Sequence, residues 1–256
     1  MDLKLEAAGC TDTGALRMNN EDAYLCCREQ GVFVVCDGMG GAAGGEVASR
    51  MAAECVSRAL CTKSETGRLS EDDLESALIE AIADANRRIY ERAQREVEVM
   101  GMGTTIVTAH VSPGTAHVAH VGDSRCYLWR EGRMELLTQD HSLVGEQVRL
   151  GRLSQEEAEN SPYRNVITRA LGTQLTVMTE YQRIPVQSGD VLLLCSDGLT
   201  RELNDGEIAG LLSRAAGGEK LDTVCQVLVD SANNAGGRDN ITCVLVRIKS
   251  GKDICR

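Results

Sequence analysis

The chain has 256 residues, and its 38 acidic and 27 basic side chains give a formal net charge of −11. This negative excess disfavours nucleic acids and anionic membrane surfaces as partners. A hydrophobic fraction of 43% is ordinary for a globular protein, and the longest apolar runs, such as VLLLC, are too short to span a bilayer. The first residues show no secretory signal. We therefore expect a cytoplasmic protein, and we expect it to be a monomer.

The cysteines are numerous but do not form a recognisable framework. There are eleven, an odd number, and no C-x-x-C pair occurs. Several lie inside apolar runs, among them Cys36, Cys195, Cys225 and Cys243. This placement favours small buried hydrophobic residues in a reducing compartment over a disulfide framework or a zinc site.

The first half of the chain shows two clusters of strand signals separated by two helix signals. Short apolar runs predict strands at residues 3–8, 22–27 and 32–36. Small apolar residues then recur on one face from Val47 to Leu60, which predicts a helix. A second helix is predicted from Leu74 to Ile89, with Ser70 as its N-cap and Asp73 three residues on. Turn signals then separate four short strands, at residues 104–111, 116–121, 124–130 and 133–138.

The second half contains one region unlike the rest. Residues 140–180 are polar and mixed, which is typical of an insertion or lid. A strand at 190–195, a helix at 221–232 and a strand at 241–248 follow. Because strands come in clusters and do not alternate strictly with helices, the pattern favours an α+β fold with mostly antiparallel sheets. Nothing marks a domain boundary, so we expect one domain over 1–256 with a flap at about 140–180.

The stretch VVCDGMGGAAGG, residues 34–45, ends an apolar strand in Asp37 and continues with five glycines among eight residues. Its G-x-G-x-x-A spacing matches a dinucleotide-binding loop. However, Asp37 would place a negative charge beside the pyrophosphate, and no second strand follows the next helix. A P-loop is excluded because no G-K-[ST] occurs. A metal site is the better interpretation of this loop.

Acidic residues at strand ends recur along the chain. Asp197-Gly198 repeats the Asp37-Gly38 pattern after another apolar strand, and other acids lie at strand boundaries: Glu21, Asp22, Asp123 and Asp239. A single Asp-Gly pair is ordinary turn chemistry. Six converging acids would repel one another unless cations compensated them, although the sequence alone does not show that they converge. Oxygen ligands of this kind suit Mg²⁺ or Mn²⁺ and not zinc.

Eight segments carry a family resemblance, in this order: TDTGALRMNNEDAYL, VVCDGMGG, GMGTTIV, AHVGDSRCYL, LTQDHSLV, RNVITRALG, LLLCSDGL and GGRDNITCVLV. Together they resemble the metal-dependent serine/threonine protein phosphatases of type 2C, the PPM family, and most closely its bacterial single-domain members. The resemblance covers nearly the whole chain. It implies a sandwich of two antiparallel sheets flanked by helices, with a flap, and a metal centre at one end.

The resemblance also implies roles for individual residues. Asp37, Asp197 and Asp239 are similar to the ligands of the first metal ion, and Asp37 to the residue that bridges to the second. The remaining implied ligands are the Gly38 carbonyl, Glu21 and Asp22 for the second ion, and Asp123 with Asp197 for a third. Arg17 matches the family arginine that binds the substrate phosphate, a fork-shaped donor suited to phosphate oxygens. Asn240 is expected to orient its neighbours.

The implied reaction is hydrolysis of phosphoserine and phosphothreonine on proteins, reversing a serine/threonine kinase. Two metal ions, Mn²⁺ or Mg²⁺, would activate a water that attacks phosphorus in line, with no phosphoenzyme. The implied partners are phosphorylated proteins, among them a kinase and its substrates. Two alternatives remain: a catalytically silent module that binds phosphoproteins, and a regulatory phosphatase devoted to one small partner. The complete set of acids argues against the silent module, and the intact TDTGALRMNNED segment and the flap favour the general enzyme.

Three departures from the family pattern concern proton donors. Relatives often carry histidine where this chain has Ala42, Met39 or Ser161. A general acid typically contributes about 10²–10⁴-fold when the leaving group is poor. We therefore predict a steep dependence of rate on leaving-group pKa, with p-nitrophenyl phosphate favoured over alkyl phosphates. His141, in QDHS, is expected to pack or hydrogen-bond and not to bind metal.

Overall fold

The computed structural model describes residues 3–65 and 70–250. Within these residues two antiparallel sheets stack face to face. The first sheet has the order β1 (Leu3–Asp12), β11 (Ile241–Ser250), β10 (Val191–Cys195), β7 (Arg125–Arg130) and β8 (Arg133–Leu136). The second has the order β2 (Asp22–Cys27), β3 (Val32–Met39), β5 (Ile106–Ser112), β6 (Thr115–Val121) and β9 (Glu180–Pro185), with β4 (Gly103–Thr104) paired to β3.

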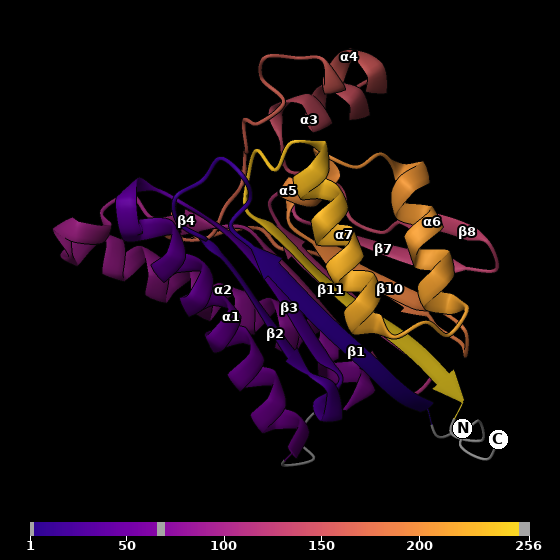
Figure 1. Cartoon of the computed structure of the whole chain (residues 1–256). Helices are drawn as coiled ribbons and strands as arrows, with labels where there is room; N and C mark the ends of the chain where they lie inside the picture. The colour runs from indigo at the N-terminus through magenta and orange to yellow at the C-terminus, as the bar shows by residue number, and fades with distance from the viewer. Residues whose placement is uncertain (1–2, 66–69, 251–256) are drawn as a thin grey trace.

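Helices cover both outer faces of the sandwich (Figure 1). The second sheet is covered by α1 (Gly41–Glu65) and α2 (Leu74–Arg95). The first is covered by α5 (Asp197–Thr200), α6 (Asp205–Ala216) and α7 (Leu221–Ala235). Two short helices, α3 (Leu143–Arg149) and α4 (Gln155–Glu159), stand above one end of the sandwich. Short 3₁₀ turns occur at Arg28–Gln30, Glu71–Asp73 and Val97–Val99.

The alternation of side chains along each strand builds the layers. In β3, Val32 and Val34 pack against α1 and α2, whereas Phe33 and Val35 face the other sheet, and all four are fully buried. Because both faces of the strand are covered, its sequence is continuously apolar and shows no alternation. The predicted α+β sandwich with helices on both sides is confirmed.

The structure adds elements that the sequence patterns missed. The edge strand β9 has the sequence EYQRIP and is only partly buried, so it shows no apolar alternation. Helix α6 begins with a capping box in which Asn204 and Glu207 bond reciprocally. The predicted N-cap Ser70 instead donates its hydroxyl to the Asp73 carboxylate and begins a 3₁₀ turn, so α2 starts at Leu74.

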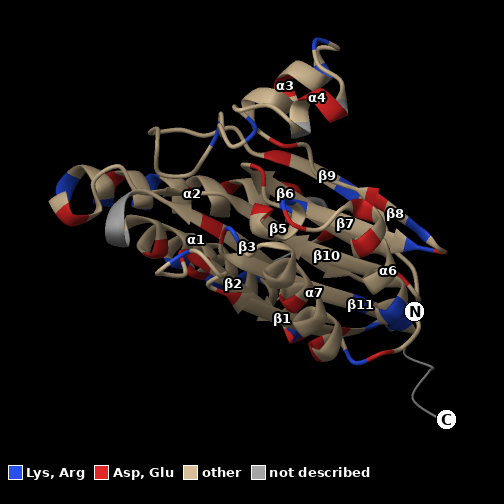
Figure 2. Ribbon diagram, turned by 45° about the horizontal axis from the view of Figure 1, so that its top comes forward, with Lys and Arg blue, Asp and Glu red and all other residues tan. Residues whose placement is uncertain are grey.

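Three features bear on the class of protein. Among the helices of the described residues, none combines the length and apolar character required to cross a bilayer. The ten described cysteines are all free thiols, and half of them are buried. Lys and Arg are intermixed with Asp and Glu along the ribbon and do not gather on one element (Figure 2).

Candidate metal centre and active site

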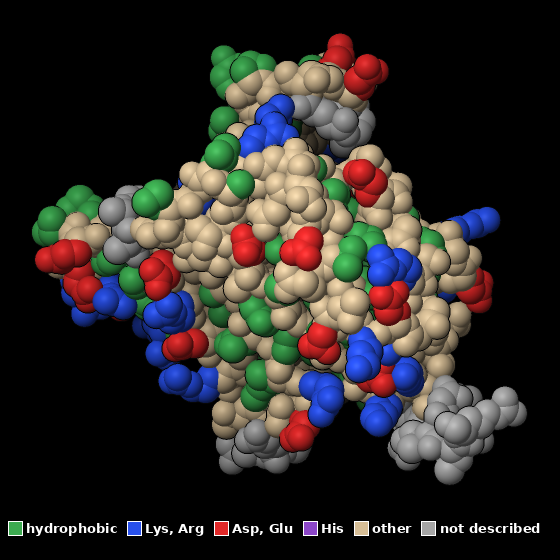
Figure 3. Space-filling view, in the orientation of Figure 1, with side chains coloured by type: hydrophobic (Ala, Val, Ile, Leu, Met, Phe, Trp, Pro, Cys, Tyr) green, Lys and Arg blue, Asp and Glu red, His purple; other side chains and the backbone are tan. Residues whose placement is uncertain are grey.

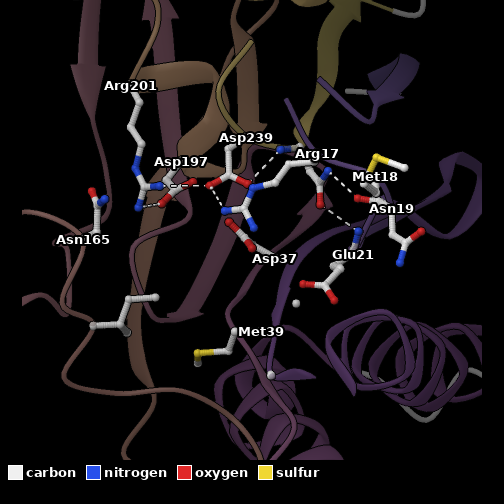
Figure 4. Close-up of a pocket in the computed structure, with 14 residues that line it drawn as sticks. Arg17, Met18, Asn19, Glu21, Asp37, Met39, Asn165, Asp197, Arg201 and Asp239 are labelled. Atoms are coloured by element: carbon white, nitrogen blue, oxygen red, sulfur yellow. Dashed lines mark hydrogen bonds and ion pairs between the residues drawn. The ribbon is translucent and has the colours of Figure 1, made fainter. Parts of the chain in front are cut away.

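A cleft of about 550 Å³ opens at the end of the sandwich beneath α3 and α4. Its walls come from five separate parts of the chain: the β1–β2 loop, the end of β3, the flap, the segment around Asp197 and the segment around Asp239. Figure 4 shows Asp37, Asp197 and Asp239 pointing toward one another, with Arg17 and Arg201 among them. The lining residues are Arg17, Met18, Asn19, Glu21, Asp37, Gly38, Met39, Gly40, Asn165, Ile167, Asp197, Arg201, Asp239 and Asn240.

Glycine after the β3 carboxylate allows two segments to pack backbone against backbone. A Cβ on Gly38 would collide with the carbonyl oxygens of Gly45 and Glu21. The amide of Gly38 donates to the Glu21 carbonyl at 3.1 Å. Thr105 fixes the strand end, because its Oγ1 accepts from the Asp37 amide at 3.0 Å and its own amide donates to the Asp37 carbonyl at 2.8 Å. Both the amide and the carbonyl of Asp37 are therefore fixed by hydrogen bonds to Thr105.

The second Asp-Gly pair uses its glycine in the same way. A Cβ on Gly198 would collide with the carbonyl oxygen of Asn240. The backbone at the start of α5 therefore packs directly against the backbone at the start of β11, with no side chain between them. This close approach sets Asp197 beside Asp239.

Asp22 lies beneath the cleft and does not line it. It is the first residue of β2 and is paired in register with Asp37. Its Oδ2 accepts a 2.7 Å hydrogen bond from Ser196 Oγ, and Ser196 Oγ in turn accepts from the Thr242 amide at 3.0 Å. The carboxylate of Asp22 thus ties the two sheets together directly under the predicted ligands.

Two arginines contact the acids. Arg17 donates to Asp239 Oδ2 at 2.9 Å, and Arg201 donates to the same oxygen at 3.1 Å. Arg201 also forms an ion pair with Asp197, four residues earlier on α5. The side chain of Arg17 is 51% exposed and that of Arg201 is 28% exposed.

Burial, and then mutual repulsion, raises the pKa of several of these acids. Burial, followed by the charge of Asp22, raises the pKa of Asp37 well above its usual range. Burial likewise raises the pKa of Asp22 and of Asp197 to about 6, although the charge of Arg201 opposes the shift at Asp197. Burial and the charge of Asp197 raise the pKa of Asp123 to about 8. Clustered buried carboxylates hold protons in this way when no cation balances them.

Asn240 joins the loop that carries Arg17 to the start of β11. Its Oδ1 accepts from the Glu21 amide at 2.8 Å. Its Nδ2 donates to the carbonyls of Thr13 and Asn19 at 2.8 and 2.9 Å. All three polar positions of this buried side chain are therefore engaged, and they fix the β1–β2 loop over the acids.

His141 connects the base of the flap to the turn that contains Asp123. Its Nδ1 accepts from the Gly122 amide at 3.1 Å, and its backbone amide donates to the Gly122 carbonyl at 3.0 Å. Among the described residues, His120, His141 and Glu180 also have the spacing of a metal site. The Arg169 guanidinium lies 3.1 Å from Glu180 Oε1 and 3.2 Å from His141 Nε2, so a cation already occupies that position. His141 hydrogen-bonds as the sequence predicts.

A profile of the family described as protein phosphatase 2C matches residues 15–245 of this chain. The chain belongs to the protein phosphatase 2C family. The serine/threonine phosphatase stp of Listeria innocua is 40% identical over 250 residues, which cover 95% of this chain and 97% of the relative. Protein phosphatase PhpP of Streptococcus pneumoniae is 36% identical over 245 residues, covering 94% and 97%. The predicted family, and with it the prediction of a phosphatase, is confirmed.

Solved structures of the protein phosphatase 2C family have the same fold. The serine/threonine phosphatase PstP/Ppp of Mycobacterium tuberculosis has a TM-score of 0.86 and 31% identity, and the alignment covers 96% of this chain and 99% of that one. The catalytic domain of PstP in complex with two manganese ions has a TM-score of 0.84 and 32% identity, covering 97% and 100%. The chain thus spans the length of a relative whose structure was solved with two manganese ions.

The residues of this protein phosphatase 2C chain fit divalent cations. Among the described residues, three buried carboxylate oxygens have no hydrogen-bond partner: Asp22 Oδ1, Asp123 Oδ1 and Asp197 Oδ1. An unpaired buried anionic oxygen is costly, and the same donor set is the one that Mg²⁺ and Mn²⁺ prefer. Metal dependence is therefore expected of this chain as of its family.

Sequence patterns missed several residues of the cleft. Arg201 could have been found, because an acid and an arginine four residues apart on a helix form a pair. Met18, Asn165 and Ile167 carry no such signal and enter the cleft only through the fold. Ala42 lies in the first turn of α1, and its side chain lies outside what the structure describes.

Proposed function

We propose that this chain hydrolyses phosphoserine and phosphothreonine on proteins in a metal-dependent reaction. One observation carries the proposal, the convergence of three acids from separate strand ends at a cleft that also contains Arg17. Isolated turn residues would not leave buried carboxylate oxygens without partners. Bound Mn²⁺ or Mg²⁺ would supply Lewis acidity and an activated water.

We assign the metal ligands as follows. Asp37, Asp197 and Asp239 would hold the first ion. Asp37, the Gly38 carbonyl and Glu21, with Asp22 beneath them, would hold the second. Asp123 and Asp197 would hold a third ion. The placement of these groups at the ends of strands supports the assignment, because the two sheets fix their backbones before any ion binds.

We assign phosphate binding to Arg17. Its guanidinium is half-exposed at the mouth of the cleft, and its ion pair among the described residues is with Asp239. A phosphoryl group entering the cleft would replace that carboxylate as the partner of Arg17, and a guanidinium binds phosphate oxygens in bidentate fashion. Asn240 holds the loop of Arg17 in place through the three hydrogen bonds described above.

The cleft favours a protein substrate. Leu16 and Met18, which flank Arg17, are 69% and 94% exposed, and Tyr163 on the flap is 60% exposed. Figure 3 shows hydrophobic side chains on the surface of the projecting flap. Exposed apolar groups around a polar cleft are typical of a surface that binds another protein.

We further propose that the chain acts as one catalytic domain with residues 140–180 as its flap, and that it works as a monomer in the cytoplasm. Free cysteines support a reducing compartment. The intermixed charges support partners other than nucleic acids or membranes. The partners would be phosphorylated proteins, among them a serine/threonine kinase and its substrates.

The test is phosphate release from a phosphothreonine peptide by purified protein with Mn²⁺, with Mg²⁺, and with excess EDTA. We expect activity with either ion and none with EDTA, restored by adding the ion back. Full activity in EDTA would refute the metal assignment. Stoichiometric peptide binding without phosphate release in Mn²⁺ would instead support the catalytically silent alternative.

A further inference from the structure

Arg201 occupies a position between two predicted metal ligands. It follows α5, and its amide donates to the Asp197 carbonyl at 2.8 Å, so its side chain projects on the same face as Asp197. The guanidinium forms an ion pair with Asp197 and donates to Asp239 Oδ2 at 3.1 Å. Figure 4 shows this guanidinium spanning the two carboxylates.

This contact is largely removed from water. The side chains of Asp197 and Asp239 are 10% and 19% exposed, and that of Arg201 is 28% exposed. Charges in such surroundings attract more strongly than they do at an open surface. The positive charge of Arg201 also acts to lower the pKa of Asp123, against the charge of Asp197, which acts to raise it. Arg201 thus provides positive charge where acids gather.

Arg17 differs from Arg201 in each of these respects. Arg17 is half-exposed and contacts Asp239 alone. It comes from a loop at the mouth of the cleft, so it can turn to a substrate. Arg201 is fixed to the same short helix as one of the ligands and bridges two of them.

We propose that Arg201 is an internal cation that neutralises Asp197 and Asp239 in the metal-free protein and competes with divalent cations for these two carboxylates. The inference rests on the metal centre proposed above. At Asp239, Oδ2 accepts from both arginines and Oδ1 accepts from the Asn240 amide at 2.9 Å, so an ion that binds this carboxylate competes with Arg201 for it. Arg201 therefore stabilises the metal-free protein and weakens metal affinity.

The experiment compares wild type with Arg201→Gln, which keeps the approximate shape of the side chain and removes its charge. In metal-free protein we expect the variant to have a Tm lower by about 3–8 °C, because two buried carboxylates lose their partner. By calorimetric titration with Mn²⁺ we expect the variant to bind about tenfold more tightly. Arg214→Gln is the matched control, because it removes an arginine that pairs with Glu219 on the surface. It should change neither quantity.

A lower metal-free Tm together with a higher Mn²⁺ affinity distinguishes this competing role from a purely structural one. A lower metal-free Tm with unchanged Mn²⁺ affinity would overturn the proposal and leave Arg201 as a structural ion pair. If Arg201→Gln does not fold without metal, Arg201→Lys replaces it, since lysine keeps the charge but cannot bridge two carboxylates as a fork. Its Mn²⁺ affinity should then exceed that of wild type, and equal affinity overturns the proposal. Absence of Mn²⁺ binding to the wild type would instead refute the metal centre itself.

Discussion

The acid cluster and the flap are built in opposite ways. The cluster lies at strand ends that both sheets fix, with Thr105, Ser196 and Asn240 holding the backbone around it. The flap projects from the sandwich as two helices of seven and five residues, with Leu150 and Tyr163 more than half exposed. Ligand geometry requires the first kind of structure, since small displacements change coordination. Adaptable contact with varied protein substrates suits the second.

The two regions are joined at the base of the flap. Ser142 pairs with Ile167, and the Thr168 amide donates to the His141 carbonyl at 2.8 Å. His141 then bonds the turn next to Asp123. The far end of the flap is tied to the sandwich as well, where Leu171 pairs with Thr104, whereas α3 and α4 project from it. Substitutions on the projecting part should therefore affect substrate binding, and substitutions in the cluster should affect chemistry and stability.

The largest effect is expected from Asp37→Asn. Removing the charge of the proposed bridging ligand should lower turnover of p-nitrophenyl phosphate by about 10³-fold or more at saturating Mn²⁺. The metal-free protein should stay folded and gain Tm, because one of the mutually repelling acids is neutralised. Asp222→Asn on the exposed start of α7 is the matched control and should match wild type in both respects. Turnover of Asp37→Asn within tenfold of wild type would exclude Asp37 as a ligand.

A second substitution tests whether the cluster depends on backbone packing. Gly198→Ala places a Cβ against the Asn240 carbonyl and should lower the unfolding free energy by about 2–3 kcal/mol. Gly210→Ala makes the same change within α6, where nothing lies within 4 Å, and should stabilise the protein by about 0.5–1 kcal/mol. Chemical denaturation measures both. Equal changes in the unfolding free energy for the two variants would contradict the inference that close backbone packing at Gly198 supports the cluster.

The metal-free protein should lose stability as pH rises. Burial raises the folded-state pKa of Asp22 and Asp197 to about 6 and that of Asp123 to about 8. Their stabilising protons are bound in full below the unfolded pKa of about 4 and are lost as pH passes through the raised values. The Tm of the EDTA-treated protein should therefore fall by at least about 5 °C between pH 5 and pH 8.5.

Added Mn²⁺ should reverse this trend, because the ion binds deprotonated carboxylates. The increase in Tm on adding Mn²⁺ should be larger at pH 8.5 than at pH 5. A metal-free Tm that rises from pH 5 to pH 8.5 would mean that other groups dominate the titration of the folded protein.

The smallest effect is expected on the flap. Tyr163→Ser removes an exposed aromatic side chain and should raise the KM for a phosphoprotein substrate by about two- to fivefold, with kcat little changed. Hydrolysis of p-nitrophenyl phosphate should not change, because that substrate is too small to reach the flap surface. Tyr90→Ser on α2, away from the cleft, is the control. Equal loss on both substrates would place Tyr163 in the catalytic centre and refute the division between the two regions.

The sequence determined that the acids lie at or next to the ends of strands, and the family to which the chain belongs. Apolar runs ending in Asp-Gly identify strand ends from local pattern alone, and the order of motifs identified the fold. The same local signals predicted the long helices α1, α2 and α7, because an apolar stripe is a property of neighbouring residues. Edge strand β9 and the short helices of the flap lacked such signals, since they bury few apolar side chains.

Only the tertiary structure decided which residues meet. The sheets bring Asp22, Asp37, Asp197 and Asp239 together from positions far apart in the chain. A pattern within one short segment cannot predict that these residues lie close to one another. The structure also decided that Asp22 lies beneath the cleft, bonded to Ser196, and that Arg201 lies between two acids. Raised carboxylate pKa values and unpaired oxygens depend on burial and on charges from other strands. Strand ends follow from a few neighbouring residues, whereas an electrostatic site depends on every segment that packs around it.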